Sequence, residues 1–191
     1  FYNYYDCLGE CGGPVEIDEC GICGGPGTVY CGGGNYECNQ EDCPDIINYC
    51  LELHEGANLV SFYGLPDDAS ITNIMYSIEG IATGVIGEGI AANYDETDGW
   101  MGSLSSIIAT AGYWVILNEI DSLCIKDAMP TNTAIAYNLH VGANLISFPA
   151  EGAIELSIGL PDDIEGSISG IIGEGVAAIN VNGVWLGSLS N

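Results

Sequence analysis

An internal duplication constrains the fold of this chain more than any other sequence feature. Residues 53–62, LHEGANLVSF, recur as LHVGANLISF at residues 139–148, an offset of 86 residues, with nine of ten positions identical or exchanging Val for Ile. At the same offset GVIGEGIAA (84–92) recurs as GIIGEGVAA, and GWMGSLS (99–105) recurs as VWLGSLS one residue out of step. Repeats that keep their spacing in this way indicate two copies of one module.

The local pattern inside the modules is typical of β-structure. Alternating apolar and polar residues, with many β-branched and aromatic side chains, predict strands that are separated by clusters of Gly, Asn and Asp. The predicted strands cover residues 58–63, 90–94, 113–118, 122–125 and 133–138. We therefore expect a mainly β chain in which each module holds at most one short helix.

One helix is predicted in the first module, over residues 70–79. Its apolar residues Ile71, Ile74, Met75 and Ile78 recur at helical spacing, Ser70 can cap its start and Gly80 can end it. The equivalent stretch of the second module contains Pro161. We expect that helix to be shorter or to start at the proline.

Cysteines dominate the beginning of the chain, where eight of the nine lie within fifty residues. Such a segment has too few aliphatic side chains for a core and needs disulfides or a metal to hold its shape. Zinc sites favour paired CxxC motifs, and this segment has one CxxC and no histidine. Disulfides are therefore favoured over zinc, although the sequence does not show which cysteines pair. Disulfides imply an oxidising environment outside the cell. The predicted disulfide cysteines are Cys7, Cys11, Cys20, Cys23, Cys31, Cys38, Cys43 and Cys50.

Cys124 stands alone, far from the others. An odd cysteine in a secreted chain is a buried thiol, a partner of the N-terminal cluster, or a bridge to a second chain. Pairing with Cys50 or another clustered cysteine is the simplest alternative. Cys124 is also the candidate for an intermolecular bond.

Charge excludes several classes of function. The chain has 27 acidic side chains against one basic residue, Lys126, and a formal charge of −26. Nucleic acids and anionic membranes are bound through Lys and Arg, so neither is expected as a partner. No apolar run is long enough to span a membrane, and 48% hydrophobic residues argue against disorder.

The acidic residues suggest calcium, because carboxylates on Gly-rich loops suit this ion. No EF-hand spacing is present, and a solvated, salt-adapted acidic surface is an equal alternative. The first calcium candidates lie in the cysteine-rich segment and the second in the DETDGW loop. These residues are Asp6, Asp18, Glu19, Asp42 and Asp45, followed by Asp95, Glu96 and Asp98.

Two short sequences, DCLGECGG (6–13) and DECGICGG (18–25), repeat one pattern. In these motifs the chain resembles secreted bacterial surface proteins, many of them marine, that carry tandem DCxGxCGG repeats similar to thrombospondin type 3 modules. The LHxGxNLISF…IIGEG…GSL module resembles part of the same proteins. The resemblance implies calcium binding by the acidic, cysteine-rich segment and a location outside the cell or on its surface. The domains we expect are residues 1–50, 51–130 and 131–191.

The two modules do not end alike. Module 1 continues through a strand-forming segment, GYWVILNEIDSLCIKDA, whereas the sequence stops at Asn191 where module 2 would repeat it. A half-buried sheet without its last strands exposes an apolar edge that is prone to pairing. Either the sequence continues, or another chain donates a strand, as in β-augmentation. The donor candidate is the initial FYNYY, with Phe1, Tyr2, Tyr4 and Tyr5 as assembly residues.

No catalytic motif is readable. His54 and His140 occupy the same position in both modules, which favours a structural role, and GVIGEG also repeats and is not a GxGxxG loop. The paired acids in LPDD (65–68 and 160–163) are typical of turns and helix starts.

We therefore predict a non-enzymatic extracellular structural protein whose copies assemble into a filament or surface matrix. The alternative is a calcium-dependent adhesin or carbohydrate-binding module of a larger surface protein. In that alternative Trp100 and Trp185, which recur in the two modules, stack on sugar rings of a glycan.

Overall fold

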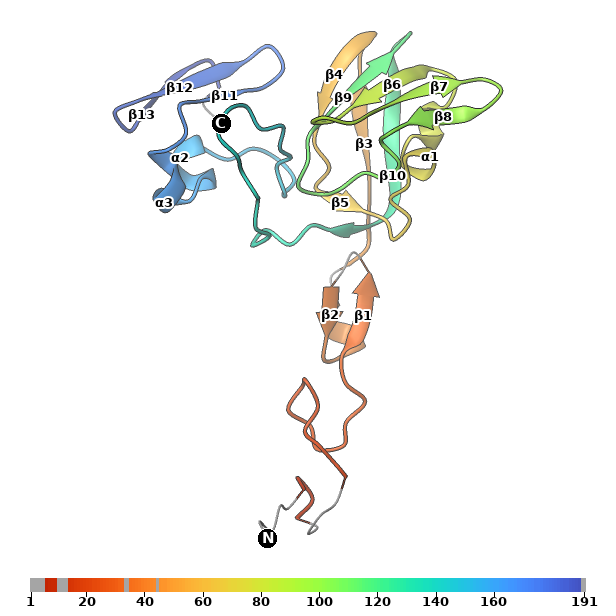
Figure 1. The fold of residues 1–191 in the computed structure, drawn as a ribbon, viewed down its shortest axis with the longest axis vertical. Helices are drawn as coiled ribbons and strands as arrows, with labels where there is room; N and C mark the ends of the chain where they lie inside the picture. The colour runs from red at the N-terminus through yellow and green to blue at the C-terminus, as the bar shows by residue number, and fades with distance from the viewer. Residues whose placement is uncertain (1–5, 10–13, 33–34, 44, 190–191) are drawn as a thin grey trace.

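The computed structural model describes residues 6–9, 14–32, 35–43 and 45–189. A narrow cysteine-rich stalk leads into a head made of two modules (Figure 1). Antiparallel sheets predominate and the helices are few and short, which confirms the predicted mainly β fold class.

Disulfides give the stalk its shape. Three of them overlap along the sequence, so that each loop opens before the previous one closes: Cys7–Cys23, Cys20–Cys38 and Cys31–Cys43. Such cross-links replace the hydrophobic core that this segment lacks. The prediction of a disulfide framework is confirmed for the described cysteines, and Cys11 lies outside the described residues.

The stalk contains little regular structure. A two-stranded hairpin is formed by β1 (Val29–Gly32) and β2 (Asn35–Glu37), and a 3₁₀ turn, η1 (Gln40–Asp42), follows. Tyr30 and Tyr36 lie opposite each other in the hairpin, with ring centroids 5.1 Å apart.

The main sheet of module 1 has five antiparallel strands in the order β4-β9-β6-β7-β8. β9 lies in its interior, between β4 and β6, although it is the last of the five in sequence. The strands are β4 (Gly56–Val60), β6 (Ala82–Ile86), β7 (Ala91–Asp95), β8 (Gly99–Gly102) and β9 (Tyr113–Leu117).

A second sheet of module 1 has three strands in the order β3-β10-β5. They are β3 (Ile47–Leu53), β5 (Gly64–Leu65) and β10 (Asp121–Pro130). The fourth disulfide, Cys50–Cys124, joins residues directly opposite each other in β3 and β10. The predicted domain boundary at residue 50 thus falls inside β3, which belongs to module 1.

The predicted helix of module 1 is present. α1 (Ile71–Ile74) is followed by a 3₁₀ turn, η2 (Tyr76–Ile78). The Ser70 hydroxyl accepts a hydrogen bond from the Asn73 N–H at 3.4 Å, which is the expected N-cap. The chain leaves the helical region at Gly80, whose φ of +83° favours glycine.

One hydrophobic core fills the space between the two sheets and the α1–η2 segment of module 1. Every buried apolar residue of the described part lies between Leu53 and Met129, except Ala178. The largest fully buried side chains are Tyr113, Phe62, Ile74, Met75, Ile78, Ile107, Leu123, Val85 and Val115.

Module 2 repeats only part of this architecture. β11 (Gly170–Ile172), β12 (Ala177–Val181) and β13 (Val184–Gly187) form a three-stranded sheet in that order. β11 pairs with β12 in the register that β6 adopts with β7. A two-residue turn at Asn182 and Gly183, both with positive φ, is typical of a type I′ hairpin and explains the one-residue offset from module 1.

The helical stretch of module 2 is broken, as the proline predicted. α2 (Leu156–Gly159) ends before Pro161, and α3 (Asp162–Glu165) begins directly after it. The fixed φ of proline suits this position at a helix start.

The predicted strand at residues 133–138 is not formed; these residues are turn and irregular structure. They correspond to β3 of module 1, whose partner is β10. No described residue of module 2 supplies an equivalent of β10. A strand sequence without a neighbouring strand has no ladder of hydrogen bonds to join, and this explains the wrong prediction.

None of the helices in the described part of the chain has the length and apolar character that a membrane span requires.

Candidate assembly site

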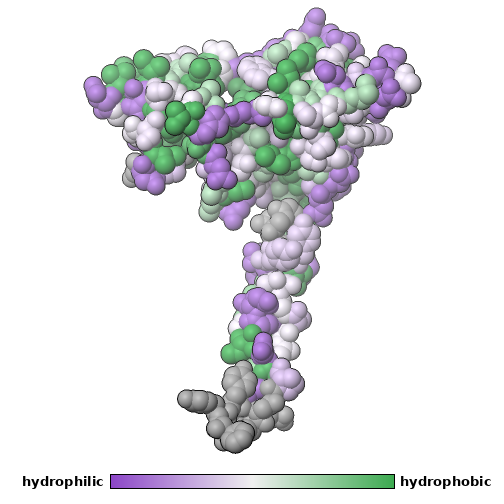
Figure 2. Space-filling model, viewed as in Figure 1, coloured by the Kyte–Doolittle hydropathy of each residue, from purple (hydrophilic) through white to green (hydrophobic). Residues whose placement is uncertain are grey.

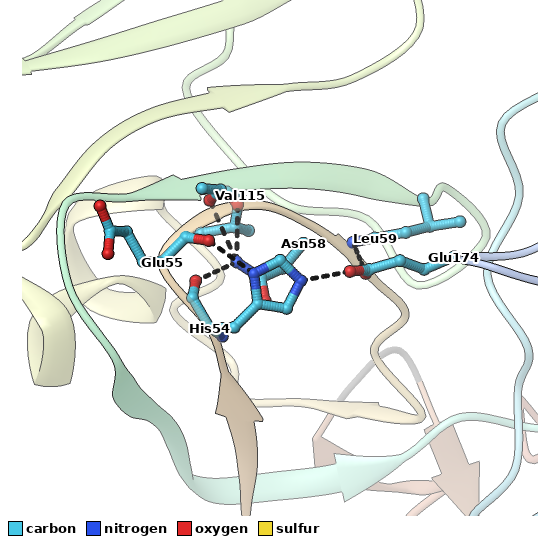
Figure 3. A network of polar contacts seen from close by, with 7 residues as sticks. His54, Glu55, Asn58, Leu59, Val115 and Glu174 are labelled. Carbon is cyan, nitrogen blue, oxygen red and sulfur yellow. Dashed lines mark hydrogen bonds and ion pairs between the residues drawn. The ribbon is translucent and has the colours of Figure 1, made fainter.

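A polar contact between the modules is centred on Glu174, in the β11–β12 turn of module 2. Its carboxylate contacts Nε2 of His54 and accepts a hydrogen bond from the Leu59 N–H at 2.7 Å (Figure 3). The other imidazole nitrogen, Nδ1, lies 2.6 Å from the carbonyl oxygen of Glu55. The ring is thus held between its own loop and the opposite module.

The same contact is made in the opposite direction. Glu88, the counterpart of Glu174, contacts Nε2 of His140 and accepts from the Leu145 N–H at 2.9 Å. Each IGEG turn therefore binds the LHxGANL segment of the other module. The two modules form an isologous pair within a single chain, as the subunits of a two-fold dimer do between chains.

These contacts shift the ionisation of the four side chains. The pKa of His54 is raised above its ordinary value, first by the Glu55 carbonyl and then by Glu174. The pKa of Glu174 is lowered, first by the Leu59 N–H and then by His54. The pair His140 and Glu88 shifts in the same directions for the same reasons.

Backbone hydrogen bonds add to the junction. The Gly112 N–H donates to the Leu145 carbonyl at 3.0 Å, and the Ser147 N–H donates to the Thr110 carbonyl at 3.2 Å. Between these bonds Ile146 forms an isolated antiparallel bridge with Ala111. One edge of the segment around Ile146 is therefore bonded to module 1.

Module 2 exposes side chains whose counterparts are buried in module 1. Leu139 is 43% exposed where Leu53 is 5% exposed, and Ile146 is 48% exposed where Val60 is 3% exposed. Figure 2 shows hydrophobic residues on the surface of module 2, at the upper left of the view. Module 2 therefore has the sequence of a β module, but its described residues do not form a closed hydrophobic core.

The contrast has a local cause at β9. In module 1, β9 covers Phe62, and the Tyr113 ring packs edge-on against it at 6.1 Å between centroids. No described strand of module 2 takes the place of β9. The counterpart of Phe62, Phe148, is 37% exposed.

An asparagine that occurs at the same position in both modules also shows the effect of β9. The Asn58 side chain bonds the backbone of His54 and Gly56, and its Nδ2 also donates to the Val115 carbonyl of β9 at 3.4 Å. Asn144 makes the equivalent local bonds to His140 and Gly142. Asn58 is buried, whereas Asn144 is only half-buried.

The first calcium candidates stabilise turns of the stalk. Oδ1 of Asp6 accepts from the Leu8 N–H at 3.1 Å, and Oδ1 of Asp18 accepts from the Cys20 N–H at 3.0 Å. The Ile22 N–H also bonds Asp18, at 2.8 Å, and this hydrogen bond is the main reason why the pKa of that carboxyl is lowered. The two DCxG-type motifs are thus one repeated Asx turn.

The remaining candidates do not converge. Asp95 accepts from the N–H groups of Thr97 and Asp98, at 2.8 and 3.2 Å, and these bonds lower the pKa of its carboxyl. Among the residues that the structure describes, no three His, Cys, Asp or Glu side chains are placed to hold a metal ion. The exposed members of the predicted set are Glu19, Asp42, Asp45, Asp95, Glu96 and Asp98.

The other predicted site residues have different outcomes. Cys124 is bonded to Cys50 within the chain, which confirms the simplest alternative and corrects its candidacy as an intermolecular bridge. Trp100 is half-buried and packs against the core and, edge-on, against Tyr94. The assembly candidates Phe1, Tyr2, Tyr4 and Tyr5 lie outside the described residues.

Sequence reasoning assigned His54 and His140 a structural role and missed the two glutamates that bind them. The signal was present, because Glu88 and Glu174 recur at the same offset as the histidines. A scan against protein-family models and searches of curated proteins and solved structures found no match.

Proposed function

We propose that this protein is a non-enzymatic extracellular structural protein whose copies assemble into a filament or surface matrix. The observation that carries the proposal is the incomplete burial of module 2. Its sequence repeats that of module 1, yet it exposes Leu139, Ile146 and Phe148. Exposed apolar surface beside a free strand edge favours association with another chain.

Two further features support a structural role. Four disulfides indicate an oxidising compartment, and an extracellular location is the simplest such compartment for this chain. The chain has no Arg and one Lys, so trypsin-like proteases have a single cleavage site. Both features suit a durable extracellular material.

Electron microscopy of the full chain, with and without a calcium chelator, tests this function. We expect ordered filaments or sheets that grow with protein concentration. Loss of order on chelation would assign the acidic residues to assembly. Discrete monomers under both conditions, confirmed by light scattering, would contradict the proposal.

A carbohydrate-binding role is the second candidate, favoured by one observation. Trp185 borders an open hollow of about 320 Å³ between α2 and β13, and its Nε1–H donates to Glu165 at 2.6 Å. Glycan retention that is lost in Trp185→Ala, with assembly unchanged, would support this role over the structural one.

A further inference from the structure

We propose that module 2 is an acceptor for a strand from a second copy of the chain, inserted between residues 142–146 and β11. The inference rests on the proposed self-assembly and identifies its acceptor and donor. The template is internal to the molecule, because β9 fills the equivalent position of module 1, between β4 and β6.

The first wall of the acceptor is the segment 142–146, the counterpart of β4. Leu145 and Ser147 direct their backbone groups to module 1. Successive residues of an extended segment present their N–H and C=O groups to opposite edges. Asn144 and Ile146 therefore face the other way, as do Asn58 and Val60, which lie opposite Val115 and Tyr113 of β9 in module 1.

The second wall is β11, the counterpart of β6. β6 pairs with β7 on one side and with β9 on the other. β11 pairs with β12 and, among the described residues, has no strand on its second side. In module 1 the counterparts of both walls bond β9 through these edges.

The chemistry of the occupant follows from β9. That strand has five residues, Tyr113–Leu117, without a charged side chain, and its alternate residues Tyr113, Val115 and Leu117 are buried. An occupant of module 2 must likewise be extended and uncharged. It must direct apolar or aromatic side chains toward Phe148.

Residues 133–138 are also uncharged and strand-forming, but they are the counterpart of β3 and continue directly into the acceptor segment. A second segment of the sequence also meets these requirements. Every strand of the described part is already paired in a sheet. Residues 1–5 carry four aromatic side chains and none of the 27 acidic side chains of the sequence. We therefore assign the donor to Phe1-Tyr2-Asn3-Tyr4-Tyr5.

Successive side chains of an extended strand point to opposite faces, so only some side chains of the donor can enter the acceptor. Tyr2 and Tyr4 share one face of an extended strand, and Asn3 lies on the other. Burying the Asn3 amide against Phe148 would leave it without polar partners, which is unfavourable. Tyr2 and Tyr4 are therefore the residues that face Phe148.

The direction of the stalk indicates that the donor segment comes from another copy of the chain. In Figure 1 the stalk extends away from both modules, and its first described residues lie at the end remote from β11. Insertion of the stalk end of one copy into module 2 of the next is a head-to-tail contact. Such heterologous contacts generate open filaments unless the rotation closes a ring.

Photo-crosslinking in the assembled full chain tests the assignment directly. A benzophenone amino acid replaces Tyr2, and isotopically light and heavy copies are mixed before assembly. We expect mass spectrometry to find crosslinks between light and heavy chains, at residues 142–148 or 170–172. Crosslinks within one chain, or to other residues of an assembled neighbour, would overturn the acceptor while leaving the structural function intact.

Substitutions provide an independent measurement. Tyr2→Asp with Tyr4→Asp on the donor, and Ile146→Asp on the acceptor, should each raise the critical concentration at least about tenfold, because each buries a carboxylate. Tyr76→Asp, at a position 73% exposed in module 1, is the matched control and should leave assembly unchanged. Assembly that survives the donor variant would refute the proposal. An unmodified chain that never assembles would refute the structural function as well.

Discussion

The carboxylate of Glu174 binds His54, 120 residues earlier in the chain, and the counterpart Glu88 binds His140. Each glutamate also caps the N–H of a leucine, Leu59 or Leu145, in the opposite module. The junction is therefore a pair of identical contacts with two ionisable groups each. The first two predictions concern these contacts.

The stability of the contact between the two modules should depend on pH, with one limit at acidic pH and one near neutral pH. The pKa of His54 is raised above 6.5, so its contribution is complete below 6.5 and is lost as pH rises through the raised value. The pKa of Glu174 is lowered below 4.5, so its contribution is complete above 4.5 and is lost as pH falls through the lowered value. Both contributions are complete between pH 4.5 and 6.5. NMR titration of the two imidazoles should give pKa values above 6.5, and ordinary values for both would contradict the contacts.

Removing one carboxylate should loosen one contact. In Glu174→Gln the Leu59 N–H loses a charged acceptor, and its hydrogen exchange should accelerate by up to about tenfold, in the range of a partly exposed charged contact. Glu88→Gln should act in the same way on Leu145 and spare Leu59. Glu96→Gln, an exposed acid of the β7–β8 turn, is the matched control. Equal exchange of Leu59 in all three variants would show that Glu174 does not hold it.

The two equivalent asparagines should differ in their effect on stability. Asn58→Ala should cost about 1–3 kcal/mol of unfolding free energy, because it leaves buried backbone groups without partners. Asn144→Ala removes the same local bonds at a half-buried position without the bond to β9, and should cost less, about 1 kcal/mol or below. Urea denaturation of each variant measures both values. Equal losses of unfolding free energy in the two variants would mean that the hydrogen bond from Asn58 to β9 adds nothing to stability.

The Cys50–Cys124 disulfide should stabilise module 1 more than any stalk disulfide does. It links residues 74 apart in sequence, for which the chain-entropy relation gives about 4 kcal/mol. Replacing both cysteines by Ser should lower the free energy of unfolding of module 1 by this order. Replacing Cys31 and Cys43, which close a loop within the stalk, is the control and should leave that value unchanged. Tryptophan fluorescence reports the unfolding, since Trp114 lies in β9.

Local structure could be predicted well from this sequence. The helix at residues 71–74 follows from apolar spacing and the Ser70 cap, and β4, β7, β9 and part of β10 follow from alternation. The strands β3, β6 and β8 were not predicted. The segment 133–138 has the same strand character, but a strand also depends on a partner, and no described residue supplies one. Local pattern does not contain that information.

The junction and a unique disulfide pairing could not be derived from the sequence for a related reason. His54 and Glu174 are each visible as members of a repeat, yet their contact depends on how the modules face each other. The same applies to Cys50 and Cys124, which become neighbours only when β3 pairs with β10. The repeat singles out these glutamates and histidines, and the odd Cys124 favours a clustered cysteine as its partner, but neither pattern establishes the contact itself.

The position of Cys50 also has a mechanical consequence. β3 continues directly from the stalk, and its fourth residue is covalently tied to Cys124 of β10. A tensile load applied to the stalk therefore passes through a sulfur–sulfur bond into the second sheet before it can shear the hydrogen bonds beyond Cys50. Under such a load, the connection between the stalk and module 1 is held by a covalent bond rather than by the folding free energy of module 1.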